Sequence, residues 1–146
     1  MESKLYDNKK VILLGGATAT GKSLLAYKIA KELNAEIINA DSMQIYKNFP
    51  ILTCHPGKKF KSDIKHHLYG YIETNKSYSA AKWLKDCTNK LNNILKNNRT
   101  VIVVGGTGLY LEFLYEGINK IPIVSSVIRQ SVEYEIISKG LDAAYA

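Results

Sequence analysis

Arginine, cysteine and long hydrophobic runs are all scarce in this chain of 146 residues. No uninterrupted apolar stretch approaches the ~20 residues that a membrane-spanning helix needs, which argues against an integral membrane protein. Cys54 and Cys87 lie far apart, and neither has a second cysteine beside it, so neither a zinc site nor a disulfide framework is indicated. The apolar run at residues 11–14 stops at two glycines, too early for a secretory leader. We therefore expect a soluble, cytoplasmic protein that does not associate with membranes.

Lysine supplies nearly all of the positive charge. Lys and Arg together number 20 against 13 acidic residues, which gives a formal net charge of +7. A basic chain favours polyanionic partners such as nucleic acid, because binding releases the cations condensed on phosphates. Arg99 and Arg129 are the only arginines, so little bidentate recognition of phosphate or guanine is available. Charge alone therefore supports a nucleic-acid partner only weakly.

The apolar patterns predict an α/β domain. Short strands are expected at residues 11–14, 36–39 and 101–104, the first of them buried on both faces. Helices are expected at residues 21–33, 78–96, 108–115 and 125–140. Alternation of strands and helices in this order is typical of a parallel sheet with right-handed crossovers. Three strands would make a narrow sheet, as though the chain stopped early.

Two of the expected helices have more detailed predictions, and one segment has none. In the helix at residues 21–33, Leu25, Ile29 and Leu33 recur at a spacing of four, and this is predicted to be the apolar face. Ala26 and Ala30 lie beside them on that face. Ser77 or Ser79 is expected to cap the helix at residues 78–96. Residues 47–77 show little periodicity and are predicted to be mostly loop. Trp83, beside the apolar face of its helix, is expected to pack in the core and not to stack on a base.

Residues 16–23, GATATGKS, match the pattern G-x-x-x-x-G-K-[ST] at every fixed position, between a predicted strand and a predicted helix. The glycines allow backbone N–H groups to turn inward around phosphate oxygens, and the helix N-terminus adds a favourable dipole. Lys22 would bring a positive charge to the terminal phosphate, and Ser23 could bind Mg²⁺. The glycine spacing does not fit a dinucleotide site. The predicted phosphate-binding residues are Gly16, Ala17, Thr18, Ala19, Thr20, Gly21, Lys22 and Ser23.

Two further polar residues follow predicted strands. Asp41 comes after the strand at 36–39, where a carboxylate can act as a general base or hold magnesium through water. The same residue could instead close an Asx-turn, and spacing does not separate these possibilities. Thr107 follows the strand at 101–104 as an expected exposed donor beside Gly105 and Gly106. Those glycines would allow a ligand to approach the backbone closely, or would only relieve strain in a turn.

The segment before residue 68 is basic. Lys58, Lys59, Lys61 and Lys65 could contact nucleic-acid phosphates, although a charged surface loop is the more ordinary interpretation. His66 and His67 are adjacent, so their side chains diverge, and no third ligand suggests a metal site.

Three stretches occur in an order that resembles the tRNA dimethylallyltransferases, also called tRNA isopentenyltransferases. They are GATATGKS, NADSMQIY and VVGGTGLYL, and HHLYGYI and YSAAKW also resemble segments of that family, so the similarity covers most of residues 11–118. It implies a P-loop NTPase-like fold of three layers with a parallel sheet. The chain departs from the usual family pattern at Ala17 and Lys65, where proline is common, and at His55, where lysine is usual.

The resemblance implies that the loop holds dimethylallyl diphosphate and not a nucleotide. Asp41 would accept a proton from N6 of an adenosine beside the tRNA anticodon, and Thr107 would hydrogen-bond a diphosphate oxygen. Lys22 and Ser23, with Mg²⁺, would stabilise the charge on the leaving group. The residues expected to contact the acceptor are Thr18, Asp41, Ser42, Gln44 and Tyr46.

Members of that family are longer than this chain. Residues 1–120 would form a diphosphate-binding core, and residues 121–146 would begin a helical insertion whose remainder is missing. We therefore expect the isolated chain to bind tRNA weakly and to transfer the prenyl group slowly or not at all. Three alternatives remain open: a small P-loop kinase that phosphorylates a hydroxyl from ATP, a prenyltransferase acting on free adenine nucleotides, and an inactive fragment that only binds diphosphate. The kinase is the less favoured, because no arginine-bearing lid is evident.

Overall fold

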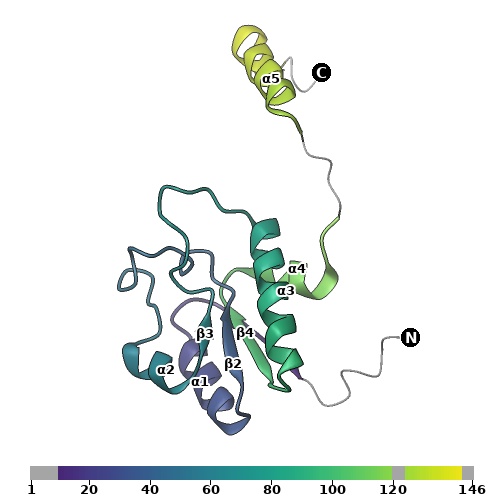
Figure 1. The fold of residues 1–146 in the computed structure, drawn as a ribbon. Coiled ribbons are helices and arrows are strands. Elements are labelled where there is room, and N and C mark those ends of the chain that lie inside the picture. Colours follow the sequence, from purple (N-terminus) through teal and green to yellow (C-terminus); the bar gives the residue numbers. More distant parts are fainter. Residues whose placement is uncertain (1–9, 120–123, 143–146) are drawn as a thin grey trace, which may run out of the picture.

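The computed structural model describes residues 10–119 and 124–142. Its strands form one parallel four-stranded sheet in the order β1-β4-β2-β3 (Figure 1). The strands are β1 (Val11–Gly15), β2 (Glu36–Asn39), β3 (His66–His67) and β4 (Val101–Gly105). The helices are α1 (Lys22–Glu32), α2 (Lys58–Asp63), α3 (Ala80–Lys96), α4 (Gly108–Glu116) and α5 (Ser126–Lys139).

Strand β4 lies in the middle of the sheet and is buried along its whole length. Val101 pairs with Val11 of β1 on one side and with Glu36 of β2 on the other. Because all pairs are parallel, the carboxyl ends of β1, β2 and β4 meet at the same edge of the sheet. The loops that carry the predicted site residues therefore start side by side.

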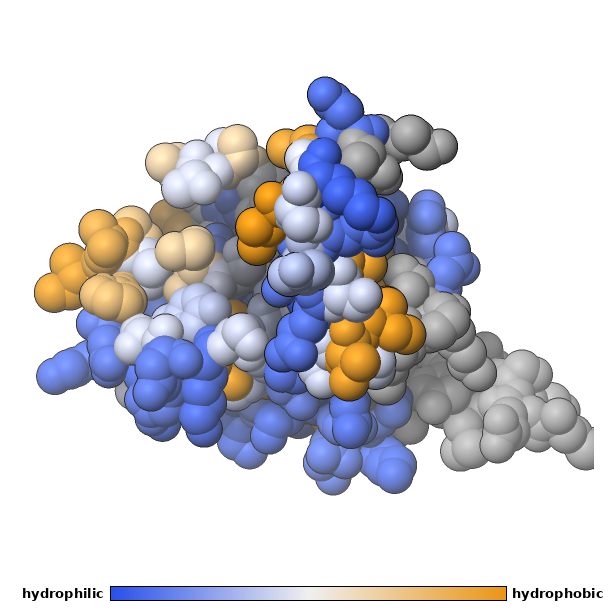
Figure 2. All heavy atoms as spheres, turned by 90° about the horizontal axis from the view of Figure 1, so that it is seen from above, coloured by the Kyte–Doolittle hydropathy of each residue, from blue (hydrophilic) through white to orange (hydrophobic). Residues whose placement is uncertain are grey.

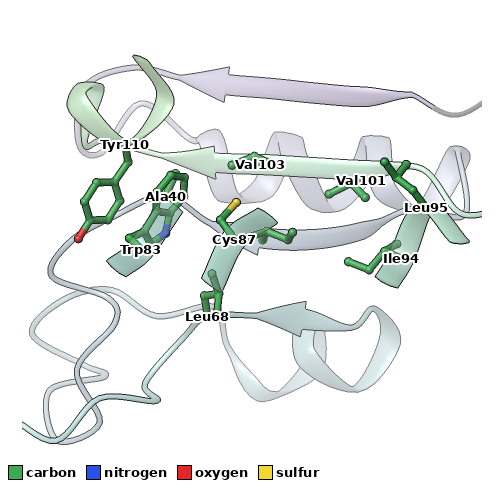
Figure 3. Close-up of a cluster of buried hydrophobic side chains, with 10 residues drawn as sticks. Ala40, Leu68, Trp83, Cys87, Ile94, Leu95, Val101, Val103 and Tyr110 are labelled. Atoms are coloured by element: carbon green, nitrogen blue, oxygen red, sulfur yellow. The ribbon is translucent and has the colours of Figure 1, made fainter. Parts of the chain in front are cut away.

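Helices cover both faces of the sheet, so the molecule has three layers. Helix α1 packs on the face formed by Ile37, Ile102 and Val104. Helices α3 and α4 pack on the opposite face, where the buried side chains include Ile38, Val101, Val103, Trp83, Cys87 and Tyr110. Figure 3 shows Trp83 beside Tyr110 at the carboxyl end of β4. Their rings stack with centroids 4.4 Å apart. The prediction that Trp83 packs in the core is confirmed.

The three predicted strands and four predicted helices are present within two residues of the expected bounds. Ser79 is the cap of α3, since its side chain accepts a hydrogen bond from the Lys82 backbone N–H. Residues 47–77 are mostly loop, as predicted, but they also contain α2 and β3, which were not predicted. Both are too short to show periodicity, and β3 exists only because His66 and His67 pair with Ile37 and Ile38 of β2.

Two predictions about burial are wrong. Strand β1 is at the edge of the described sheet and is not buried on both faces: Val11 is 40% exposed. In α1, Ala26 and Ala30 face the sheet, whereas Leu25 is 48% exposed. Small alanines allow the helix to lie close to the strands, and this displaces the leucines from the contact.

Helix α5 lies apart from the sheet in Figure 1, and none of its residues is buried. Ser125 caps it by accepting a hydrogen bond from the Ile128 backbone N–H. Within the described part of the chain, no helix has the length and apolar character needed to cross a membrane.

Candidate phosphate-binding site

The loop at residues 16–23 joins β1 to α1 and is shaped by local contacts. Gly21 has φ of 83°, a left-handed conformation that glycine adopts without steric cost, and it immediately precedes the first turn of α1. Ala19 also has a positive φ of 64°, which is uncommon for a residue with a Cβ. The Thr20 hydroxyl donates to the Ala17 carbonyl at 2.8 Å, and the Lys22 ammonium donates to the same carbonyl. Both hydrogen bonds fold the loop back on the Ala17 carbonyl, and the Lys22 side chain lies against the loop.

This loop forms one wall of a cleft of about 760 Å³. Thr18, Ala19, Gly21, Lys22 and Ser23 line the cleft from the loop side. Asp41, Ser42, Gln44 and Thr107 line it from the ends of β2 and β4. The structure therefore brings most of the predicted site residues to a single cavity. Tyr46 is not among the described residues that line it, and instead pairs with Ile72 in an isolated bridge.

The two walls meet at Gly106. A Cβ atom at this position would lie 3.6 Å from Asp41 Oδ2 and 3.6 Å from the Gly16 carbonyl oxygen. Gly105 has a different role, since a Cβ there would lie 2.0 Å from the Ala40 carbonyl oxygen. Gly105 therefore allows β4 to pack against the end of β2, whereas Gly106 keeps open the space between the carboxylate and the loop.

The two carboxylate oxygens of Asp41 have different surroundings. Its Oδ1 accepts a hydrogen bond from the Met43 backbone N–H at 2.9 Å, which closes an Asx-turn. Its Oδ2 faces Gly106 and the loop. The two interpretations of Asp41 that the sequence left open are thus compatible: one oxygen shapes the turn, and the other is presented to the cleft.

Asn39 holds the backbone of Asp41 in place. The Asn39 side chain donates to the carbonyls of Asp41 (2.9 Å) and Leu68 (3.0 Å) and accepts from the Asp41 N–H (2.9 Å). Its own carbonyl accepts from Trp83 Nε1 at 2.9 Å, and its side chain is fully buried. Asn39 was not predicted as a site residue. A polar side chain at the end of a strand expected to be buried was the available signal, because such a group needs partners.

Thr107 is bound to the same turn. Its hydroxyl accepts from the Ser42 N–H at 2.9 Å and donates to the Ser42 hydroxyl at 3.2 Å. The expectation of an exposed donor is therefore wrong for this structure: Thr107 is half-buried and its proton is already used. It joins the end of β4 to the Asp41 turn.

Gln44 braces the outer part of the cleft. Its side-chain amide donates to the carbonyls of Thr53 (2.8 Å) and Cys54 (3.2 Å), and so holds the loop after residue 49 against the Asp41 turn. Its amide N–H groups thus have a structural use that the sequence did not indicate.

His55 and Tyr69 line the cleft and were not predicted as site residues. Their rings meet edge to face with centroids 5.9 Å apart. Burial raises the pKa of Tyr69, and the nearby Asp41 charge adds to the effect. Burial and Lys61 lower the pKa of His55, although the Gln44 backbone and Asp41 act in the opposite direction. Both side chains are therefore held in their neutral forms beside the carboxylate.

The cleft offers few oxygen ligands for a divalent cation, so a bound ion would keep part of its water shell. The Ser23 hydroxyl and the Asp41 carboxylate are oxygen donors in one cleft. Among residues 10–119 and 124–142, no three His, Cys, Asp or Glu side chains gather into a metal cage. Mg²⁺ commonly keeps several waters and binds through one or two protein oxygens plus substrate phosphates. The residues present are compatible with that mode.

A parallel sheet between helical layers, with a glycine-rich loop joining its first strand to a helix at the sheet edge where β2 also ends, defines an α/β protein with a P-loop NTPase-like fold. The model of the IPP transferase family matches residues 44–146. The chain belongs to this family.

Curated relatives carry the name tRNA dimethylallyltransferase. The chain is 49% identical over 136 residues to the protein of Pelagibacter ubique. The aligned residues make up 93% of this chain and 44% of the relative. It is 44% identical over 126 residues to the protein of Rickettsia bellii, covering 86% of this chain and 40% of the relative. The chain thus spans less than half the length of these relatives.

Solved structures show the same likeness. The tRNA isopentenylpyrophosphate transferase of Bacillus halodurans superimposes with a TM-score of 0.74 at 31% identity, covering 92% of this chain and 45% of that one. A eukaryotic dimethylallyltransferase that acts on tRNA superimposes with a TM-score of 0.75 at 29% identity, covering 86% and 32%. These likenesses do not favour the kinase alternative.

Proposed function

We propose that the whole protein transfers a dimethylallyl group from dimethylallyl diphosphate to N6 of an adenosine next to the tRNA anticodon. The observation that carries the proposal is the position of Asp41 Oδ2, which faces the phosphate loop across Gly106. In this position Asp41 would be a base for the acceptor, in the same cleft as a loop that would hold the leaving group. Relatives named tRNA dimethylallyltransferase support the choice of reaction.

The loop at residues 16–23 would hold the diphosphate. Its backbone N–H groups and the start of α1 favour an anion there. The Lys22 ammonium would turn from the Ala17 carbonyl to the diphosphate, and Thr107 would redirect its proton from Ser42 to a diphosphate oxygen. Ser23 is the residue that would hold Mg²⁺, and Asp41 is left free to act as the base. When bound, the ion would neutralise charge on the leaving group.

The acceptor would enter on the Asp41 side. The N6 lone pair attacks the allylic carbon, so that an N–C bond forms while the C–O bond to the diphosphate breaks. Pyrophosphate leaves with the bonding electrons, and the N6 proton passes to Asp41. The adenine must leave its stack to reach this position. Thr18, Ser42 and Gln44 remain proposed acceptor contacts, and Tyr46 would reach the RNA only outside the cleft.

We assign residues 1–120 to the diphosphate-binding core and residues 121–146 to a helical region outside it. Helix α5, the described part of that region, buries none of its residues. Residues 120–123, where the boundary falls, lie outside the described residues.

The test is thermal stabilisation of the chain by dimethylallyl diphosphate with Mg²⁺, with ATP as the comparison. Saturation at about 100 times Kd stabilises a fold by about 2.7 kcal/mol, which a melting curve resolves. Lys22→Ala should abolish the stabilisation, whereas Lys28→Ala, an exposed lysine of the same helix, should leave it intact. Asp41→Asn should keep diphosphate binding. Stronger stabilisation by ATP than by dimethylallyl diphosphate would contradict the proposal and favour a kinase.

A further inference from the structure

Helix α2 borders the cleft through Phe60 and carries three exposed lysines. Phe60 lines the cleft and stacks on Tyr27 of α1, with ring centroids 4.5 Å apart, which fixes the helix in place. Lys58, Lys59 and Lys61, on the same helix, are exposed. The position of these charges relative to the cleft is therefore set by packing.

The described parts of the chain compensate the charge of these lysines only in part, through the electrostatic attraction of Lys59 to Asp63. None of the three lies within ion-pair distance of a carboxylate in residues 10–119 and 124–142. Asp63, the acidic residue of α2, accepts a hydrogen bond from the Tyr27 hydroxyl at 2.5 Å, and this contact lowers the pKa of Asp63. The rim is consequently a cationic surface that borders a reaction cleft.

The neighbouring rim is hydrophobic. Ile51 is 92% exposed and Leu52 is 80% exposed, and Leu52 also lines the cleft. Figure 2 shows hydrophobic side chains gathered at the left edge of the molecule, beside a hydrophilic region. A mouth with cations on one side and apolar side chains on the other fits a single-stranded nucleic-acid loop, whose backbone is anionic and whose unstacked bases have apolar faces.

We propose that Lys58 and Lys59 of α2 bind backbone phosphates of the acceptor RNA and hold its single-stranded loop over the cleft. This inference rests on the proposed function, because it takes the acceptor to be an adenosine in RNA. Lysine is a point charge without a planar fork, so these contacts position the backbone and do not read base sequence. Lys61 is left out of the assignment because it lies over the Tyr69 ring, 5.7 Å from its centroid.

The experiment compares Lys58→Gln/Lys59→Gln with Lys85→Gln/Lys90→Gln, two exposed lysines of α3 on the opposite face of the sheet. Both variants lose the same charge. The probe is a fluorescent RNA hairpin with an adenosine in its single-stranded loop, titrated with the full chain over a series of salt concentrations. Each phosphate contact in single-stranded nucleic acid contributes about 0.7 to the slope of log affinity against log salt. The α2 variant should lower that slope by about 1.4 and the affinity about tenfold at low salt, and the α3 variant should change neither by more than about twofold.

Equal losses in the two variants, or no binding of the hairpin by the wild-type chain, would overturn the inference. Equal affinity for a fully double-stranded RNA of the same length would overturn the preference for a loop. Binding of dimethylallyl diphosphate is measured in parallel on the same proteins. If the wild-type chain fails to bind the diphosphate, the proposed function fails. If both variants bind it normally but do not differ toward RNA, only the role of α2 fails.

Discussion

The two walls of the cleft are built in different ways. In the phosphate loop, Thr20 and Lys22 bond to a carbonyl three and five residues away. The other wall, formed by Asp41, Ser42, Gln44 and Thr107, is called the Asp41 wall. Besides its local turn, it depends on hydrogen bonds between residues far apart in the chain: Thr107 to Ser42 across 65 positions, and Trp83 to Asn39 across 44. One wall is therefore a product of local sequence, and the other exists only when the sheet and α3 are assembled.

Because of this difference, substitutions in the two walls should have different effects on stability and on ligand binding. A change in the Asp41 wall should cost stability, because it breaks contacts between elements. A change in the phosphate loop should cost ligand binding and leave the fold nearly unchanged, because its contacts are exposed and local.

The largest effect is expected from Gly105→Ala. The new Cβ would lie 2.0 Å from the Ala40 carbonyl oxygen, so the ends of β2 and β4 must separate. We expect a loss of more than about 3 kcal/mol in the free energy of unfolding, measured by urea denaturation. Gly108→Ala is the matched control, because a Cβ there meets nothing within 4 Å. Equal stability of the two variants would show that the close approach of β4 to Ala40 is not a constraint.

Asn39→Ala should come next. It leaves the buried backbone groups of Asp41 and Leu68 without their partner, at a cost of about 2–3 kcal/mol. Asn92→Ala, an exposed position in α3, should change stability by less than about 0.5 kcal/mol. A small loss at Asn39, comparable with that at Asn92, would mean that the turn holds its shape without this bracing.

Thr107→Ala and Thr20→Ala compare the two walls directly with the same substitution. Thr107→Ala removes two hydrogen bonds to Ser42 and should cost about 1–1.5 kcal/mol. Thr20→Ala removes one exposed local bond and should cost no more than about 0.5 kcal/mol. Thermal denaturation of both variants in the absence of ligand measures the difference, and the reverse order would contradict the comparison.

The smallest expected effect is a pH dependence located at the Asp41 wall. Burial lowers the pKa of both His55 and His66, whose rings pack on Tyr69. As the pH decreases, the two imidazoles gain a proton in the unfolded chain before they do so in the folded protein. The free energy of unfolding therefore has its full value above pH 6.5, the ordinary histidine pKa, and falls as the pH decreases from there through the lower pKa values of the folded state. The melting temperature should therefore be lower at about pH 5 than at about pH 7. A His55→Gln/His66→Gln variant should lose part of this dependence, and an unchanged profile would exclude these two groups as its source.

Much of the fold could be predicted because its signals are local. Strands β1, β2 and β4 follow from hydrophobic runs, and the cap at Ser79 follows from a single side chain near a helix end. Strand β3 could not be predicted, because two residues carry no period and become a strand only through pairing with β2. The exposure of Leu25 could not be predicted from the sequence either, because the distance between α1 and the sheet decides which apolar side chains are buried.

The sequence by itself determined the phosphate loop, because a glycine-rich turn between a strand and a helix takes its shape from its own residues. It also indicated Asp41, through its place at the end of a strand. Only the tertiary structure decided that the second oxygen of Asp41 lies beside Gly106, and that the Thr107 hydroxyl donates to Ser42. These arrangements depend on hydrogen bonds between segments that meet only when the strands align, and no local pattern encodes the direction in which a side chain points across such a contact.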